Sequence, residues 1–144
     1  MYVLAPFLLL ALAGGRYTLA VSSNIMIAHS FEGEQFGPAQ RMHGATYEVE
    51  AALSADALRQ DLNWVMDIGQ FTNVLDAVLA KYHLQNLDET CPGENTTTEF
   101  MCRRIYEDLV EEFRERGEDV KGMVLNVGLR ESSRAGASYE EVVR

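Results

Sequence analysis

Alternating apolar and polar residues characterise the first half of the chain. Residues 46–53 (Thr-Tyr-Glu-Val-Glu-Ala-Ala-Leu) alternate as a half-buried strand does. Residues 17–29 contain two apolar stretches, 17–21 and 25–29, that predict a partner strand. A Gly/Pro loop at 32–38 separates this strand from the one at 46–53. The pattern therefore predicts a strand–loop–strand unit with His29 and His43 at its loop end.

Two later stretches have the three-and-four spacing of amphipathic helices. The first follows Asp67, a residue type that caps helices, and ends near Tyr82. The second starts from capping residues at 95–99 and stops at Gly117. Residues 54–63 are polar and permit a helix. The expected buried stripes are Ile68, Phe71, Val74, Leu75, Val78 and Leu79, then Met101, Ile105, Leu109 and Phe113.

The C-terminal part returns to strand-like patterns. Residues 124–129 predict a strand, a turn is expected at 134–136, and residues 138–142 predict the last strand. The predicted order is β-β-α-α-β-β. We therefore expect an α+β fold, in which two helices cover one face of an antiparallel four-stranded sheet.

Composition narrows the functional classes. The chain has 144 residues, 47% of them hydrophobic, which suits one domain with a substantial core. A net charge of −10 disfavours nucleic acid and anionic membrane surfaces as partners. The only cysteines, Cys91 and Cys102, make no disulfide framework, and Cys102 lies on an apolar helical face as a packed thiol.

Residues 1–15 differ from the rest because they are almost wholly apolar. They are too short to span a bilayer and resemble the core of a signal peptide, but a basic start is missing. We expect a non-functional extension, with an export signal as the alternative, and a single domain at 16–144.

Two histidines at a hairpin mouth are a reasonable start for a metal or substrate site. Two polar loop residues without function would give the same pattern. The residues around them favour the first interpretation, because 28–29 (Ala-His) and 42–47 (Met-His-Gly-Ala-Thr-Tyr) resemble the 6-pyruvoyl- and 6-carboxy-tetrahydropterin synthase family. The family's later motifs have counterparts here in the same order, at residues 86–88 (Asn-Leu-Asp), 97–99 (Thr-Thr-Glu) and 129–131 (Leu-Arg-Glu). The resemblance covers roughly residues 16 to 143.

This resemblance implies a tunnelling fold whose monomers close edge to edge into trimers, two of which stack into a homo-hexamer. It also implies a cytoplasmic enzyme, a lyase acting on dihydroneopterin triphosphate. Closure of the sheet would remove the open edge strands, which gives the assembly a physical reason.

The resemblance also implies a catalytic zinc held by three histidines, and here the chain departs from the family. His29 and His43 occupy two of the ligand positions, but the third is Ala45. Ala39 stands at the position of the catalytic thiol, and residues 83–84 (His-Leu) replace the family's Asp-His pair. We therefore expect no catalytic residues of the family type and no cofactor, with zinc as the alternative.

The ligand-holding positions match better. Glu131 resembles the residue that anchors the pterin, since one carboxylate can accept hydrogen bonds from a ring N–H and its neighbouring amine. Thr97, Thr98 and Glu99 resemble the group that closes around the same ring edge, although helix capping alone would explain Thr97 and Glu99. Tyr139 follows Glu131 as in the family's last motif.

Three functions remain open on these grounds. The first is a homologue that binds a pterin-like ring without running the family reaction. The second is an active lyase with a rearranged site that uses His83, although a loop histidine without contacts is the favoured interpretation of that residue. The third is a non-enzymatic oligomeric protein.

Overall fold

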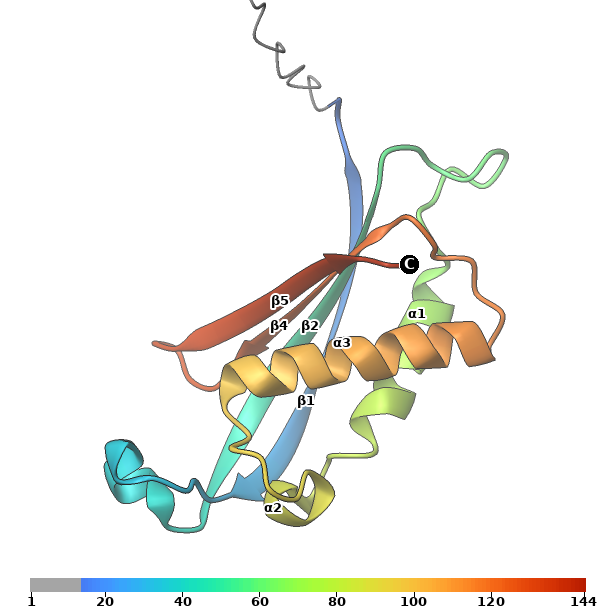
Figure 1. Cartoon of the computed structure of the whole chain (residues 1–144). Coiled ribbons are helices and arrows are strands. Elements are labelled where there is room, and N and C mark those ends of the chain that lie inside the picture. Colours follow the sequence, from blue (N-terminus) through green and yellow to red (C-terminus); the bar gives the residue numbers. More distant parts are fainter. Residues whose placement is uncertain (1–13) are drawn as a thin grey trace, which may run out of the picture.

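The structure, a computed structural model, describes residues 14–144, so most of the apolar extension lies outside the described residues. The described chain forms a five-stranded sheet in the order β3-β1-β2-β4-β5, with helices on one side (Figure 1). The strands are β1 (Tyr17–His29), β2 (His43–Ala55), β3 (Gln85–Asn86), β4 (Val124–Arg130) and β5 (Gly136–Val142). The helices are η1 (Glu34–Gln40), α1 (Ile68–Leu79), α2 (Leu87–Thr90) and α3 (Thr98–Glu115).

The sheet confirms the predicted α+β class and the tunnelling-fold order. Strands β1, β2, β4 and β5 pair antiparallel, and the β1–β2 register places His29 directly opposite His43. The two-residue strand β3 adds a parallel pairing with Ile27 and Ala28 of β1. Two residues are too few to show an alternating pattern, so this fifth strand had no sequence signal.

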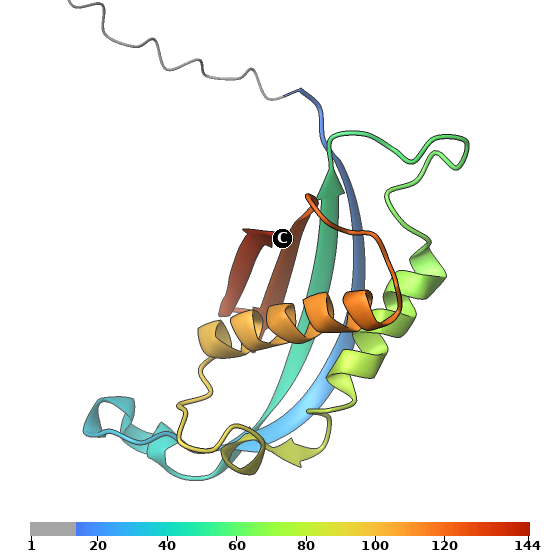
Figure 2. The same cartoon turned by 45° about the vertical axis from the view of Figure 1, so that its right-hand side comes forward.

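Helices α1 and α3 pack on the same face of the sheet (Figures 1 and 2), and their apolar stripes form the core with that face. Phe71 of α1 meets Phe113 of α3 with ring centroids 5.6 Å apart. The predicted stripes are buried with one exception. Ile68 is 63% exposed, because the packing of α1 begins one turn later, at Phe71.

The helix ends follow the capping chemistry in the sequence. Asp67 Oδ1 accepts a hydrogen bond from Gln70 N at 2.8 Å, which starts α1. Gly117 ends α3 in the left-handed region, with φ of 71°. Residues 56–66 form turns rather than a helix, and the left-handed φ angles of Asp61 and Asn63 show why a helix cannot run through them.

A buried polar contact joins the end of α1 to α3. The Tyr82 hydroxyl donates a hydrogen bond to the buried Asp108 carboxylate, and Arg104 Nε lies 3.3 Å from the same hydroxyl. Burial and the bond to Asp108 raise the pKa of Tyr82, so the phenol stays a donor. This contact fixes where the chain leaves α1 for β3 and α2. In the described part of the chain no helix is long and apolar enough to cross a membrane.

Candidate functional site

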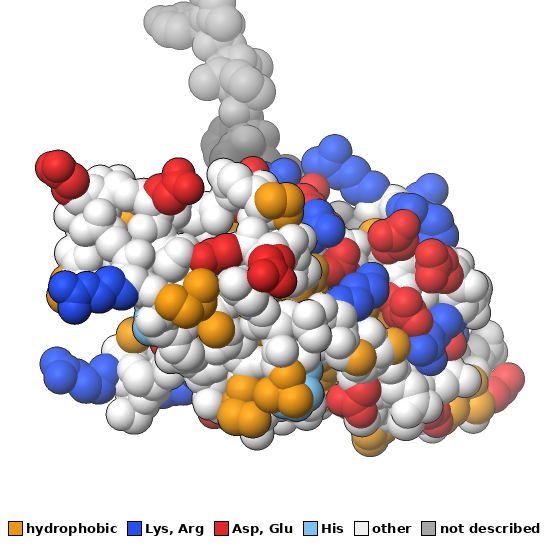
Figure 3. Space-filling model, turned by 90° about the horizontal axis from the view of Figure 1, so that it is seen from below, with side chains coloured by type: hydrophobic (Ala, Val, Ile, Leu, Met, Phe, Trp, Pro, Cys, Tyr) orange, Lys and Arg blue, Asp and Glu red, His pale blue; other side chains and the backbone are white. Residues whose placement is uncertain are grey.

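The two histidines predicted at the hairpin mouth lie side by side. Their ring centroids are 4.6 Å apart, His29 is buried, and His43 is half-buried. They sit at the end of the molecule where β1 and β2 meet η1 and α2 (Figures 1 and 2). In the view from below, only small areas of histidine side chain are exposed, some of them next to apolar side chains (Figure 3), which agrees with the burial of His29. The hairpin register therefore brings the pair together, as the sequence predicted.

Backbone carbonyls orient both imidazole rings. His29 Nδ1 lies 3.1 Å from the Thr96 carbonyl oxygen, and His43 Nδ1 lies 2.7 Å from that of Arg41. A carbonyl oxygen only accepts, which favours a proton on each Nδ1. His29 Nδ1 also lies 3.0 Å from the Thr96 hydroxyl, which can accept from the same N–H. In a neutral ring of this tautomer, Nε2 keeps a lone pair. Burial lowers the pKa of His29, and the neighbouring His43 lowers it further, which favours the neutral ring.

Aromatic rings surround the histidines. The Phe31 ring lies 4.6 Å from that of His29 and 5.7 Å from that of His43, and Phe36 packs against Phe31 at 4.9 Å. Tyr47, two pleats along β2, meets His29 edge-on at 6.5 Å. We call these five side chains the aromatic cluster. It makes one wall of the site apolar.

Two side chains from the segment around α2 hold the loop that carries Phe31. Asp88 accepts from Ser30 N at 3.0 Å, and Asn86 Oδ1 in turn accepts from Asp88 N. Asn95 Oδ1 accepts from Glu32 N at 2.7 Å, while Asn95 Nδ2 donates to Glu32 O at 3.0 Å. The loop is thus fastened on both sides of Phe31.

Glu131 follows β4 at the same end of the sheet. Thr98 Oγ1, in the first turn of α3, donates to Glu131 Oε2 at 3.2 Å. The carboxylate raises the pKa of the His29 imidazole, opposing burial, and it also raises the pKa of the buried Tyr47 phenol. Glu131, Thr98, Tyr47 and His29 therefore belong to one site, formed by β1, β2, β4 and α3.

The other residues that the sequence singled out make contacts outside the group formed by Glu131, Thr98, Tyr47 and His29. Thr97 caps α3, its hydroxyl accepting from Phe100 N at 3.3 Å, and Glu99 points to solvent in the same turn. The Tyr139 ring meets that of Tyr106 edge-on, and its hydroxyl donates a hydrogen bond to Glu141. His83 is exposed but not free of contacts, since its Nδ1 accepts from Met26 N at 3.2 Å. The turn before β3 brings this histidine onto β1, which its sequence spacing did not reveal.

The donor set does not fit a three-histidine zinc site. His29 Nε2 is a buried atom with no hydrogen-bond partner, and its Nδ1 contact to a carbonyl is typical of a metal-binding histidine. Ala45 faces the same side of the sheet as His43 but offers no ligand atom. Among residues 14–144, no group of three or more His, Cys, Asp or Glu side chains could hold a metal ion.

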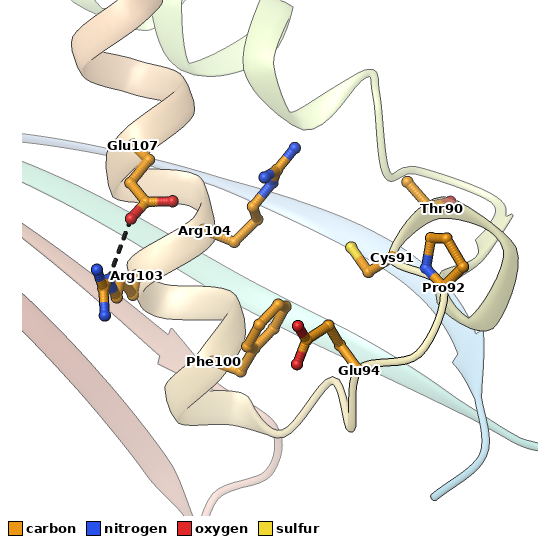
Figure 4. A pocket seen from close by; sticks show the side chains of 8 residues that line it. All are labelled: Thr90, Cys91, Pro92, Glu94, Phe100, Arg103, Arg104 and Glu107. Atoms are coloured by element: carbon orange, nitrogen blue, oxygen red, sulfur yellow. Dashed lines mark hydrogen bonds and ion pairs between the residues drawn. The ribbon is translucent and has the colours of Figure 1, made fainter.

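A separate pocket of about 450 Å³ lies between α3 and the loop after α2 (Figure 4). Its guanidinium groups are already engaged, Arg103 with Glu107 at 3.1 Å and Arg104 with Tyr82. Cys91 lines it as a buried thiol whose pKa burial raises, which leaves it unreactive. None of the predicted ligand residues lines this pocket.

Sequence reasoning missed Phe31, Tyr47, Thr96 and Asn95 as parts of the site. Tyr47 carried a signal, because it is the second inward-facing residue of β2 after His43. The others act through contacts to residues far away in the chain, such as Thr96 with His29. No local pattern reports a contact of that kind.

Comparison with known proteins agrees with this architecture. The 6-pyruvoyl tetrahydropterin synthase structure from Caenorhabditis elegans superposes with a TM-score of 0.75 at 18% identity, covering 89% of this chain and 97% of that one. The enzymes from Plasmodium vivax and Plasmodium falciparum give TM-scores of 0.72 and 0.69 at 16% and 15% identity. They cover 90% and 89% of this chain, and 99% of their own.

At such identities the structures show the fold alone. No curated protein sequence gives a significant match. The sequence profile described as 6-pyruvoyl tetrahydropterin synthase matches residues 18–142, from the start of β1 to the end of β5. The chain belongs to the 6-pyruvoyl tetrahydropterin synthase family.

Proposed function

We propose that this chain binds a pterin-like ring through Glu131 and does not carry out the zinc-dependent reaction of its family. The observation that carries the proposal is the Thr98–Glu131 hydrogen bond, which holds a carboxylate at the edge of the histidine site. A carboxylate has about four lone-pair positions, and Thr98 uses one of them. Two parallel acceptors remain for the ring N–H and its exocyclic amine.

Three substitutions support the loss of the family reaction. Ala45 leaves two imidazoles where a catalytic zinc needs three protein ligands. Ala39 offers neither a thiolate nor a base. Residues 83–84 present His83 and Leu84 in place of an Asp-His pair, and His83 Nδ1 is already engaged by the backbone of Met26. A rearranged lyase that uses His83 is therefore the weaker alternative.

A comparison of two rings tests the proposal. Pterin and lumazine differ in one exocyclic group, an amine in pterin and a carbonyl oxygen in lumazine. We expect pterin to bind about 10- to 100-fold more tightly, because lumazine loses one hydrogen bond and turns an oxygen toward the carboxylate. Isothermal titration calorimetry would measure both affinities. Equal affinities, or no binding of either ring, would refute the proposal, and the latter would favour a non-enzymatic oligomeric protein.

We also propose that residues 16–144 act as one cytoplasmic domain that assembles into a homo-hexamer, a dimer of trimers. Strand β5 and the first half of β1 are open sheet edges in the single chain. Apolar side chains lie close to one of them, with Met26 at 50% and Leu84 at 68% exposed. Pairing between copies would satisfy the edges and cover these side chains.

Analytical ultracentrifugation at micromolar concentration is expected to show a hexamer, about six times the mass of one chain. Glu140→Pro, in the middle of edge strand β5, removes one backbone donor from the pairing edge and is expected to shift the distribution toward smaller species. Glu140→Ala, which shortens the same side chain but keeps the backbone N–H, is the control and is expected to leave the distribution unchanged. A monomer for the unmodified chain at this concentration would contradict the assembly.

A further inference from the structure

The pocket between α3 and the loop after α2 has no part in the proposed ring binding (Figure 4). Its volume of about 450 Å³ lies in the range of small-molecule sites, about 300 to 1,000 Å³. Thr98, which contacts Glu131, lies two residues before Phe100 of the pocket wall. Two residues turn a helix by about 200°, so these side chains leave α3 on nearly opposite sides. The pocket is therefore separate from the histidine site.

A buried contact fixes the orientation of Arg104 in the pocket wall. Its Nε lies 3.3 Å from the Tyr82 hydroxyl and 4.0 Å from Asp108 Oδ1, and these partners are only 2% and 6% exposed. Both contacts use Nε alone. Among residues 14–144, the two terminal nitrogens of Arg104 have no hydrogen-bond partner. A guanidinium held in this way offers two parallel N–H donors, which match the two oxygens of a carboxylate.

Glu94 supplies the opposite charge. No ion pair in the described part of the chain uses its carboxylate. Cys91 points from the loop toward α3 (Figure 4), and it senses both charges: burial raises its pKa, Arg104 lowers it, and Glu94 raises it again. The remaining two charges of the pocket, Arg103 and Glu107, pair with each other at 3.1 Å. One cation and one anion are thus left for a ligand.

We propose that this pocket binds an amino-acid zwitterion, a free amino acid or a dipeptide with an apolar side chain. The ligand carboxylate accepts from the terminal nitrogens of Arg104, and the ligand ammonium group donates to Glu94. An anion alone would be repelled by Glu94 and a cation alone by Arg104, so a ligand that carries both charges is favoured. Phe100 and Pro92 supply apolar contact area, and the Cys91 thiol behaves as a small apolar group.

Leucine and leucyl-leucine test the inference and distinguish the two sources of the zwitterion. We would titrate each by calorimetry into the full-length protein in its native assembly. The tighter binder is then compared with its C-terminal amide, which lacks the carboxylate, and with its N-acetyl form, which lacks the ammonium group. Each blocked form is expected to bind at least about 10-fold more weakly, because one charge-assisted contact is lost and one charge of the pocket stays unpaired.

Glu94→Gln is expected to weaken binding of the zwitterion about 10-fold. It is expected to leave the affinity of the N-acetyl form unchanged, since that form has no ammonium group for Glu94 to hold. The side chain is exposed, so the fold is expected to survive. Glu89→Gln is the matched control, because Glu89 is an exposed carboxylate of α2 that does not line the pocket. It changes the net charge equally and is expected to keep the affinity.

The outcomes are independent of the proposed ring binding, because pterin titrations do not involve this pocket. Binding that needs both charged groups of the ligand and is weakened by Glu94→Gln alone would support the inference. No binding of leucine or leucyl-leucine at millimolar concentration would overturn it. Blocked forms that bind as tightly as the zwitterion, or an unchanged affinity in Glu94→Gln, would also overturn it.

Discussion

Glu131→Gln is expected to reduce pterin affinity about 30- to 1000-fold, which corresponds to about 2–4 kcal/mol. Glutamine keeps the volume of the side chain but replaces one acceptor oxygen with an amide donor. That donor faces a donor of the ring, so one hydrogen bond is lost and a repulsive contact is added. Glu131 is exposed after β4, so the fold is expected to survive the change. Calorimetric titration would measure the affinity, and circular dichroism the fold.

Two further variants calibrate this result. Thr98→Val removes the hydroxyl that holds Glu131 Oε2 and is expected to cost about 1 kcal/mol of binding free energy. Glu111→Gln, on the exposed side of α3, changes the net charge equally and is expected to leave affinity unaltered. If Glu131→Gln binds pterin as well as the unmodified chain does, the ring is held elsewhere.

Ala45→His is expected to raise the zinc content of the purified protein from well below one ion per chain to nearly one. Ala45 pairs with Ile27, next to the pair formed by His29 and His43 on the same face of the sheet. A histidine there stands one pleat from His43 and diagonally opposite His29, which completes a three-imidazole set. Elemental analysis after gel filtration would measure the zinc.

The control for this variant is Thr46→His, which adds a histidine to the same strand but on the opposite face. It is expected to leave the zinc content unchanged. Near-stoichiometric zinc in the unmodified chain, lost in His29→Ala, would contradict the prediction and revive the rearranged lyase.

The sequence predicted the parts of this molecule that depend on regular spacing. The alternation in β2 and the cap at Asp67 are local features, and the structure confirms them. The same alternation set the register that pairs His29 with His43. The aromatic cluster could not be predicted, because Phe31 lies in a loop whose position depends on distant side chains.

The position of Glu131 could be predicted from the sequence, but its hydrogen-bond partner could not. Its place after a strand followed from the pattern of residues 124–129, but its partner Thr98 lies 33 residues earlier, on a helix. Ile68 illustrates the opposite case, since a correct helical spacing assigned it to the core while the packing begins one turn later. Periodicity gives the face of a helix but not the point at which its neighbours end.

The long sequence separation of the contacts that build the site has a consequence for folding order. The β1–β2 hairpin closes across one short loop, whereas the bonds from His29 to Thr96, Ser30 to Asp88 and Glu32 to Asn95 span 67, 58 and 63 residues. Contacts between distant residues carry a larger loop-closure entropy and form late. We therefore expect the site to become ordered after the hairpin, at the same stage as the β2–β4 pairing, whose partners from Ser54–Val124 to Glu48–Arg130 lie 70 to 82 residues apart. A hairpin formed on its own would lack the ability to bind a ligand.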